Sequence, residues 1–189
     1  TVARGSYRLS DEEATQLAPV WQVNARDDQL PPDGDWRTWY VRGGRGSGKT
    51  RTGAETLASW ILACDGDGMD GDWAVVAPTF GDARDVCIEG PSGLLQALGG
   101  TAGGLIRPGG WNRSHGELFL NSGARVYIDG ANDGAYRTQG KNLRGAWADE
   151  IGLWRNPYWR VAWAESVAFA VRIHPARIVA TGTPKQGHG

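Results

Sequence analysis

The stretch Gly43-Gly44-Arg45-Gly46-Ser47-Gly48-Lys49-Thr50 decides the fold of this chain. It matches G-x-x-x-x-G-K-[ST] without a mismatch, the pattern of loops that hold nucleotide phosphates. Glycine at these spacings allows backbone conformations that a Cβ would forbid, so that successive N–H groups can turn toward one anion. The stretch predicts a phosphate-binding loop (P-loop), with Lys49 reaching the β- and γ-phosphate oxygens and the Thr50 hydroxyl placed to ligate Mg²⁺.

The sequence on either side of the loop argues against a chance match in a chain with 29 glycines. Residues 36–41 have the pattern of a strand, and residues 50–64 that of a helix with Ala54, Leu57, Ala58 and Ile61 on one face. A loop that opens a helix also offers phosphate the favourable N-terminal dipole. Strand, loop and helix in this order are the context in which the motif indicates nucleotide binding.

Length and composition set broader limits. The 189 residues predict a single domain over 1–189, in which about residues 1–35 form a helical lead-in. The net charge of −1 gives no global electrostatic case for nucleic acid. Cys64 and Cys87 lack metal-ligand spacing and are expected to be reduced, half-buried thiols. No apolar run approaches the ~20 residues of a membrane span, so no membrane partner is expected.

Strands alternate with helices along the chain, which predicts an α/β fold with a mainly parallel central sheet flanked by helices. A capping box at residues 10–13 predicts a short N-terminal helix. The acidic run 65–72 and the glycine-rich run 99–110 are expected to be a solvated turn and a loop. Asn156 and Pro157 predict a helix start, and Trp159 and Trp163 of that helix are expected in the core. Further strands are expected at 72–77, 117–120, 124–129, 145–149 and 177–181, and further helices at 80–89 and 92–98.

A P-loop requires a second element, a hydrophobic strand that ends in an acid. Two segments qualify, one ending at Asp129 and the other at Asp149-Glu150. We favour the second because it supplies two adjacent carboxylates, and neighbouring side chains at a strand end point to opposite sides. Asp149 is expected to hold the hydration shell of Mg²⁺ and Glu150 to polarise the attacking water. Asp129 is then a turn residue at the hairpin end, although it remains a rival.

A third element, Ala180-Thr181-Gly182-Thr183-Pro184-Lys185, directly follows the last predicted strand. Thr181 and Thr183 place hydroxyls at the carboxyl end of a strand, where open α/β sheets bind ligands. An ordinary Thr-Pro turn is the alternative interpretation.

The three segments GGRGSGKTRTGAE, RTQGKNLRGAWADE and ATGTPK, in this order and spacing, resemble the ATPase domain of the large terminase subunit of tailed double-stranded DNA bacteriophages. The resemblance covers about residues 21–185. It implies an ASCE-type P-loop NTPase fold, ATP hydrolysis with Mg²⁺, and a homo-oligomeric ring that docks on the portal protein and translocates double-stranded DNA. It also implies a small terminase subunit that selects the DNA, and a location in the host cytoplasm and transiently at the procapsid portal vertex rather than in the mature virion.

Family members usually carry a nuclease domain after the ATPase domain. This chain stops at Gly189 without a later carboxylate cluster, so we expect no nuclease site within it.

The resemblance also extends upstream of the first predicted strand. The segment 25–32 resembles the family's adenine-recognition stretch, in which Gln29 would pair with the adenine edge; a surface glutamine is the alternative.

The arginine finger has three candidates. Arg45 lies within the P-loop and could act in cis, whereas Arg137 and Arg144 lie in the polar stretch before the Asp149-Glu150 strand, where the resemblance implies an arginine presented in trans to a neighbouring subunit. A surface salt bridge is the alternative interpretation of each. We prefer Arg137 in trans, with Arg45 holding phosphate and positioning the loop. The expected nucleotide-binding set is Gln29, Gly43, Gly44, Arg45, Gly46, Ser47, Gly48, Lys49 and Thr50, and Thr181 and Thr183 are expected to couple hydrolysis to DNA movement.

Two other functions compete with the ATP-driven translocase. A P-loop kinase is disfavoured by the Asp149-Glu150 pair, which suits water activation. A nucleotide-dependent assembly module would bind ATP and form a ring but hydrolyse little alone, because a complete site can be idle without its neighbours.

Overall fold

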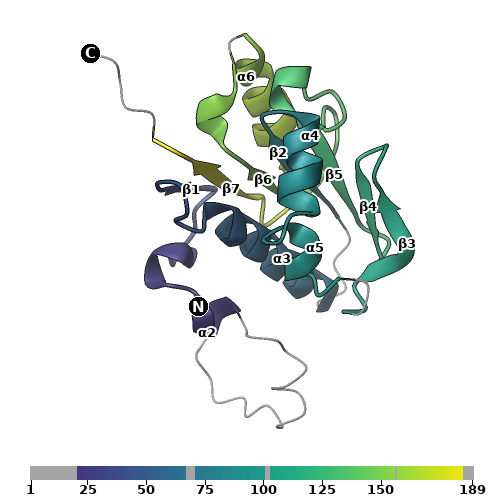
Figure 1. Ribbon diagram of the computed structural model, residues 1–189. Helices are drawn as coiled ribbons and strands as arrows, with labels where there is room; N and C mark the ends of the chain where they lie inside the picture. Colours follow the sequence, from purple (N-terminus) through teal and green to yellow (C-terminus); the bar gives the residue numbers. More distant parts are fainter. Residues whose placement is uncertain (1–20, 67–70, 101–102, 156, 185–189) are drawn as a thin grey trace.

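A computed structural model describes residues 21–66, 71–100, 103–155 and 157–184 (Figure 1). The helix predicted from the capping box at residues 10–13 lies outside the described residues, as do Asn156 and residues 67–70 of the acidic run 65–72. Among the described residues no helix is long and apolar enough to cross a membrane.

Within the described residues, seven strands form one sheet in the order β1-β7-β6-β2-β5-β4-β3. The first five strands in this order are parallel, and the hairpin of β4 and β3 adds an antiparallel edge. The carboxyl ends of the five parallel strands therefore meet at one edge of the sheet. The strands are β1 (Thr38–Arg42), β2 (Asp72–Ala77), β3 (Ile106–Asn112), β4 (Glu117–Leu120), β5 (Arg125–Gly130), β6 (Leu143–Ala148) and β7 (Arg177–Gly182).

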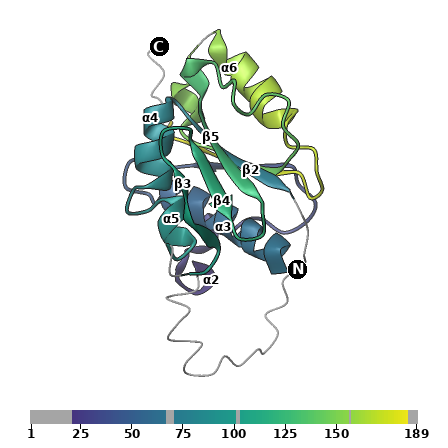
Figure 2. The ribbon, with the colours of Figure 1, turned by 90° about the vertical axis from the view of Figure 1, so that its right-hand side faces the viewer.

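Helical segments cover both faces of this sheet, as the view in Figure 2 shows. Alternate residues of β2 enter two separate cores: Trp73 and Val75 pack with α3 and α5, whereas Ala74 and Val76 pack with η5. This alternation explains the near-continuous apolar sequence of the strand. The helical segments are α2 (Trp21–Asn24), η1 (Asp27–Gln29), α3 (Lys49–Gly66), α4 (Phe80–Asp82), η2 (Ala83–Ile88), α5 (Leu94–Ala97), η3 (Ala131–Asp133), η4 (Ile151–Leu153), α6 (Tyr158–Val161) and η5 (Ala162–Ala168).

Helix α3, which begins in the P-loop, lies close against β6. A Cβ at Gly53 of α3 would come within 2.3 Å of the Trp147 indole on β6, so glycine is required for this approach. Trp147 is fully buried, and α3 in turn buries Leu57 and Ile61 on the same face. The predicted apolar face of this helix therefore places the P-loop next to the acid-bearing strand.

The glycine-rich run 99–110 was expected to be a loop, but it contains the start of β3. Ile106 pairs with Leu120, and Trp111 pairs with Leu118 after a register shift. Pro108 is tolerated because β3 is an edge strand, and Gly109 takes a positive φ of 66° within the irregular part. The strand was missed because its middle consists of Pro-Gly-Gly, which are weak strand formers.

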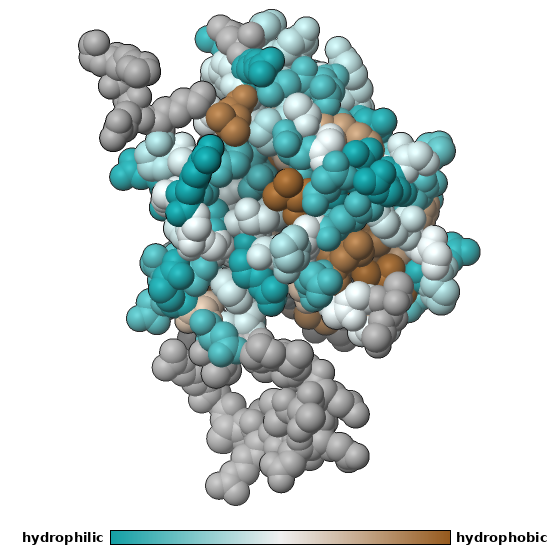
Figure 3. Space-filling model, viewed as in Figure 1, coloured by the Kyte–Doolittle hydropathy of each residue, from teal (hydrophilic) through white to brown (hydrophobic). Residues whose placement is uncertain are grey.

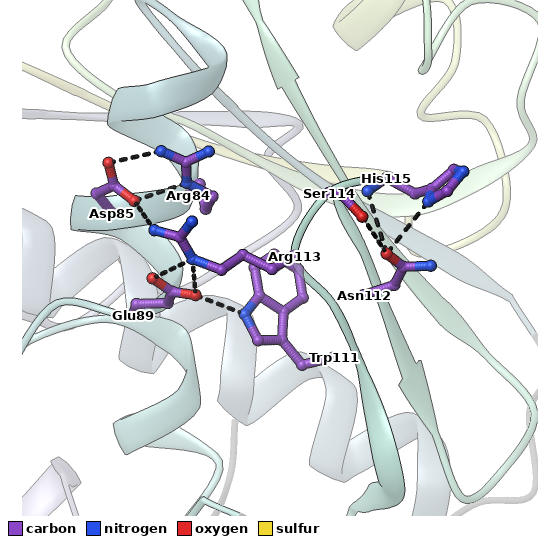
Figure 4. A network of polar contacts seen from close by, with 8 residues as sticks. All are labelled: Arg84, Asp85, Glu89, Trp111, Asn112, Arg113, Ser114 and His115. Atoms are coloured by element: carbon purple, nitrogen blue, oxygen red, sulfur yellow. Dashed lines mark hydrogen bonds and ion pairs between the residues drawn. The ribbon is translucent and has the colours of Figure 1, made fainter.

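A polar network ties the β3–β4 hairpin to η2 (Figure 4). Arg113, just beyond β3, donates to Glu89 (2.9 Å) and to Asp85 (2.9 Å). The Trp111 indole donates to the same Glu89 carboxylate at 2.8 Å. The hydrogen bond from Arg84 is the largest cause that lowers the pKa of Asp85. These contacts hold the antiparallel edge of the sheet on the helical layer.

One further expectation was wrong. Trp159 was expected in the core, but it is 42% exposed, and Trp154 is the tryptophan buried on that face, at 8%. The strand predicted over residues 72–77 has the same bounds in the structure, and its first residue, Asp72, accepts hydrogen bonds from the Arg125 N–H and the Tyr127 hydroxyl. On the face seen in Figure 3, apolar residues form only scattered patches, because most apolar side chains lie inside the two cores.

Candidate nucleotide site

The P-loop connects β1 to α3 at the shared carboxyl edge of the sheet. Gly46 and Gly48 have φ values of 75° and 84°, in the left-handed region that favours glycine. A Cβ at Gly43 would lie 2.5 Å from the Ser47 Oγ atom. Three of the four glycines therefore sit where a side chain is strained or sterically excluded.

Lys49, near the end of this loop, is 8% exposed. Its Nζ atom donates to the Gly44 carbonyl at 2.8 Å and lies 3.6 Å from Glu150 Oε1. The ammonium group thus faces both the loop and the acid-bearing strand. A phosphate bound between them would meet a positive charge that is already in place.

Asp149 and Glu150 follow β6 and have different surroundings. Asp149 is 5% exposed, and its Oδ1 atom accepts a 2.6 Å hydrogen bond from the Thr181 hydroxyl. Burial raises the pKa of Asp149, and the bond from Thr181 opposes that rise. Glu150 takes a left-handed backbone conformation (φ 44°, ψ 49°), which is uncommon outside glycine. The Glu150 carboxylate faces Lys49, with Oε1 3.6 Å from its Nζ atom.

The third motif contacts both acids directly. Thr181 is fully buried, and its hydroxyl also accepts hydrogen bonds from the Trp147 indole and the Glu150 N–H, each at 3.3 Å. Thr183 donates its N–H to Glu150 Oε2 at 2.9 Å and its hydroxyl to Oε1 at 2.8 Å. The two threonines therefore hold one acid each, which is more than an ordinary Thr-Pro turn would do.

Asp129 lies at the end of β5, and its carboxylate is 2% exposed. It accepts hydrogen bonds from the N–H groups of Gly130 (2.9 Å), Arg137 (2.7 Å) and Thr138 (3.2 Å). Burial raises the pKa of Asp129, and these N–H groups lower it. Its expected place in a hairpin-end turn was wrong: the hairpin turn is at the other end of β5, and Asp129 instead anchors the loop before β6.

The candidate arginines occupy different edges of the sheet. Arg137 belongs to the loop anchored by Asp129, at the carboxyl edge; its side chain is 46% exposed and lies 4.5 Å from the centre of the Phe80 ring. Arg144 stands near the start of β6, at the opposite edge, and donates to the His174 carbonyl. Arg45 is exposed on the P-loop itself.

Gln29 lies against the P-loop rather than at the surface, with 6% of the residue exposed. Its Nε2 atom donates to Thr52 Oγ1 at 3.1 Å, and its Oε1 atom accepts from the Arg26 N–H at 3.3 Å. Arg26 also donates to the Ser47 carbonyl at 2.8 Å. The sequence reasoning missed Arg26, because no residue pattern links it to a loop some twenty positions away.

Cys87 was also missed as a neighbour of the site. Both cysteines are more buried than expected, Cys64 at 6% and Cys87 at 0% exposure. Burial is the main cause that raises the pKa of Cys87 well above its usual value, and the thiol is hydrogen-bonded to Asp149. A neutral thiol therefore packs beneath the acid that we expect to serve the metal.

The residues at this edge suit Mg²⁺ in their chemistry. The Asp149 carboxylate and the Thr50 hydroxyl are oxygen donors, and Mg²⁺ is commonly held by one or two carboxylates together with waters and substrate phosphates. Among the described residues no cluster of three or more His, Cys, Asp or Glu side chains has metal-holding geometry. A metal bound here would therefore take most of its ligands from the phosphates and from water.

The strand order places β7, which carries the third motif, between the P-loop strand β1 and the acid-bearing strand β6. This arrangement defines an ASCE-type P-loop NTPase fold, as the sequence predicted. Residues 41–189 match the family described as terminase large subunit, T4likevirus-type, N-terminal. The chain belongs to this family.

Solved structures agree with this fold. The large terminase ATPase domain of Thermus phage P74-26 has a TM-score of 0.66 and 15% identity, over 96% of this chain and 72% of that chain. The large terminase of a thermophilic bacteriophage, in complex with ATP-gamma-S, has a TM-score of 0.56 and 18% identity, over 86% of this chain. The present chain spans about a third of that second protein, since the match covers 35% of it. No curated protein sequence matches the chain.

Proposed function

We propose that this chain is an ATPase domain that drives double-stranded viral DNA into a procapsid. The observation that supports this most is the meeting of Lys49, Asp149 and Glu150 at one sheet edge, with the third motif bonded to both acids. Family membership and the likeness to the P74-26 ATPase domain support the same function. The large terminase of the thermophilic bacteriophage has been solved with ATP-gamma-S and with ADP, which supports ATP as the nucleotide.

In this proposal phosphate binding, metal binding and orientation of the attacking water are assigned to different residues of the chain. The P-loop N–H groups and Lys49 bind the phosphates, and Thr50 and Asp149 hold Mg²⁺, which would offset phosphate charge. Glu150 accepts a hydrogen bond from the attacking water and so orients it. Both Glu150 oxygens also accept bonds from Thr183, and each has a second lone pair for the water. Thr183 is thereby placed to link turnover to the segment that follows β7.

The wider assembly is part of the same proposal. The domain would work in a homo-oligomeric ring docked on the portal protein, with a small terminase subunit selecting the DNA. This activity belongs in the host cytoplasm, transiently at the procapsid portal vertex, and not in the mature virion. A nuclease activity is not proposed for the residues of this chain.

The position of Arg137 favours a second possibility for the isolated chain, a module that binds ATP but hydrolyses little until it assembles. Arg137 contacts Phe80, which follows β2, and Asp129, near the end of β5. Its side chain is 46% exposed, so its guanidinium can be presented to the γ-phosphate of a neighbouring subunit. In that case a site is complete only after assembly, and the isolated chain would hydrolyse little.

The first test is phosphate release by the wild-type protein over a range of protein concentrations, with and without DNA. A rate that rises more steeply than the protein concentration is expected, because sites completed between subunits form only on assembly. A constant rate per subunit at every concentration would contradict subunit-completed sites, and no ATP-dependent phosphate release under any condition would contradict the ATPase.

Replacing Thr181 and Thr183 together with valine should leave ATP binding in place and stop DNA packaging by the full-length protein. Valine keeps the shape of threonine but removes the hydroxyl bonds to Asp149 and Glu150. ATP binding is measured by titration with a fluorescent analogue and packaging by nuclease-protected DNA. Thr38→Val, at the exposed start of β1 on the opposite edge, is the matched control. Normal packaging by the double variant would reduce the third motif to a turn.

A further inference from the structure

Residues 26–29, before β1, are hydrogen-bonded to the P-loop. Arg26 donates from Nη2 to the Ser47 carbonyl (2.8 Å) and from Nε to Asp28 Oδ1 (3.0 Å). Gln29 donates to Thr52 Oγ1, and that hydroxyl donates in turn to the Gly48 carbonyl at 3.1 Å. Two consecutive carbonyls of the P-loop, those of Ser47 and Gly48, are therefore held from the same segment.

Holding these carbonyls fixes the direction of the neighbouring N–H groups. In a planar trans peptide the C=O of one residue and the N–H of the next point in opposite directions. The Ser47 carbonyl faces Arg26, so the Gly48 N–H points away from Arg26. The Gly48 carbonyl also accepts from the Thr52 N–H at 2.9 Å, and the Lys49 N–H correspondingly points out of the first turn of α3. These are the N–H groups that a P-loop offers to phosphate.

The amide of Gln29 takes part in these contacts with the P-loop. Its Oε1 atom is occupied by the Arg26 N–H and its Nε2 atom by Thr52. The Nε2 atom is so close to Gly48 that a Cβ there would lie 2.6 Å away. An amide packed against the loop backbone in this way supports the loop, while its second N–H and the second lone pair of Oε1 remain for a further partner.

We propose that Arg26 and Gln29 are positioning residues of the P-loop, which orient its N–H groups for the phosphates of a nucleoside triphosphate. Asp28 holds the guanidinium of Arg26 in the geometry that reaches Ser47. This inference rests on the proposed nucleotide-binding function and adds a role for the segment before the first strand. It is separate from the adenine contact expected for Gln29.

The test compares ATP with inorganic tripolyphosphate, which has the phosphates but no base. Both are titrated by competition against a fluorescent ATP analogue, in the presence of Mg²⁺, on wild type, Arg26→Ala, Arg26→Lys and Gln29→Ala. Arg26→Ala removes a hydrogen bond from a charged group, so its affinity for both ligands should fall by the same factor, about tenfold. Arg26→Lys should lose less, because an ammonium keeps the charge and can make one of the two guanidinium contacts. Arg107→Ala, an exposed arginine of β3, is the matched control and should bind like wild type.

The outcomes separate the possibilities. A fall in ATP affinity with tripolyphosphate affinity unchanged, in Arg26→Ala and in Gln29→Ala, would show that the segment acts on the base alone and would overturn the inference. Unchanged affinity for both ligands would overturn it as well. The melting temperature without nucleotide should stay near that of wild type, and a large drop would assign the segment a role in general stability instead. If wild type binds neither ligand, it is the proposed function that fails.

Discussion

An Arg137→Ala protein is expected to lose about 10³–10⁵-fold in ATPase rate, the range over which arginine fingers act in P-loop enzymes. The guanidinium stabilises negative charge that develops on the transferred phosphoryl group, so its removal should affect turnover far more than ATP binding. Arg137 suits this role because it is half-exposed at the carboxyl edge of the sheet, in a loop held by the buried Asp129 carboxylate. Its ion pair with Asp129 is long, at 3.9 Å, and leaves the guanidinium available to a neighbouring subunit.

Mixing two defective proteins tests whether Arg137 acts in trans. A Glu150→Gln subunit still carries Arg137, so it should restore partial phosphate release to Arg137→Ala subunits in mixed rings. An Arg45→Ala subunit, whose defect lies in its own P-loop, should gain nothing from the same partner. Full activity of Arg137→Ala alone, or no rescue on mixing, would refute the trans assignment. Arg144 would then be tested next, although it lies at the opposite edge of the sheet.

Glu150→Gln is expected to bind ATP as wild type does and to lose about 10²–10⁴ in turnover, the usual contribution of a general base. Glutamine has the size of glutamate, and its oxygen can still accept one of the bonds from Thr183, so the local structure should survive. What is lost is the negative charge that draws a proton from water. Binding is followed with a fluorescent ATP analogue and turnover by phosphate release.

Two further variants are compared with Glu150→Gln. Lys49→Ala should lose both hydrolysis and much of the triphosphate affinity, because the ammonium offsets phosphate charge in the ground state and in the transition state. Glu165→Gln, an exposed acid of η5, is the matched control and should behave as wild type. Wild-type turnover by Glu150→Gln would return Asp129 to consideration as the catalytic acid. Its surroundings favour a structural role instead, because the carboxylate is 2% exposed and accepts three N–H bonds that hold the loop before β6.

The sequence by itself determined the P-loop, the α/β class and the mainly parallel sheet. These features follow from local rules: glycine spacing permits the loop, and the periodicity of apolar residues separates strands from helices. The helix over residues 50–64 was predicted almost to its observed bounds, Lys49–Gly66, because its apolar face repeats with helical spacing. The order of the three motifs was enough to indicate the terminase family, to which the chain belongs.

Only the tertiary structure decided how the site residues divide their contacts. The sequence offered Thr181 and Thr183 as equivalent hydroxyls, but one is buried on Asp149 and the other holds Glu150. Asp129 likewise accepts a hydrogen bond from the N–H of Arg137, 8 positions later, and Gln29 donates one to Thr52, 23 positions later. Local patterns carry no information on such pairings, since they depend on which strands become neighbours and on how closely α3 packs against Trp147. Strand order and close packing are properties of the whole chain, and they alone brought these groups within hydrogen-bond distance.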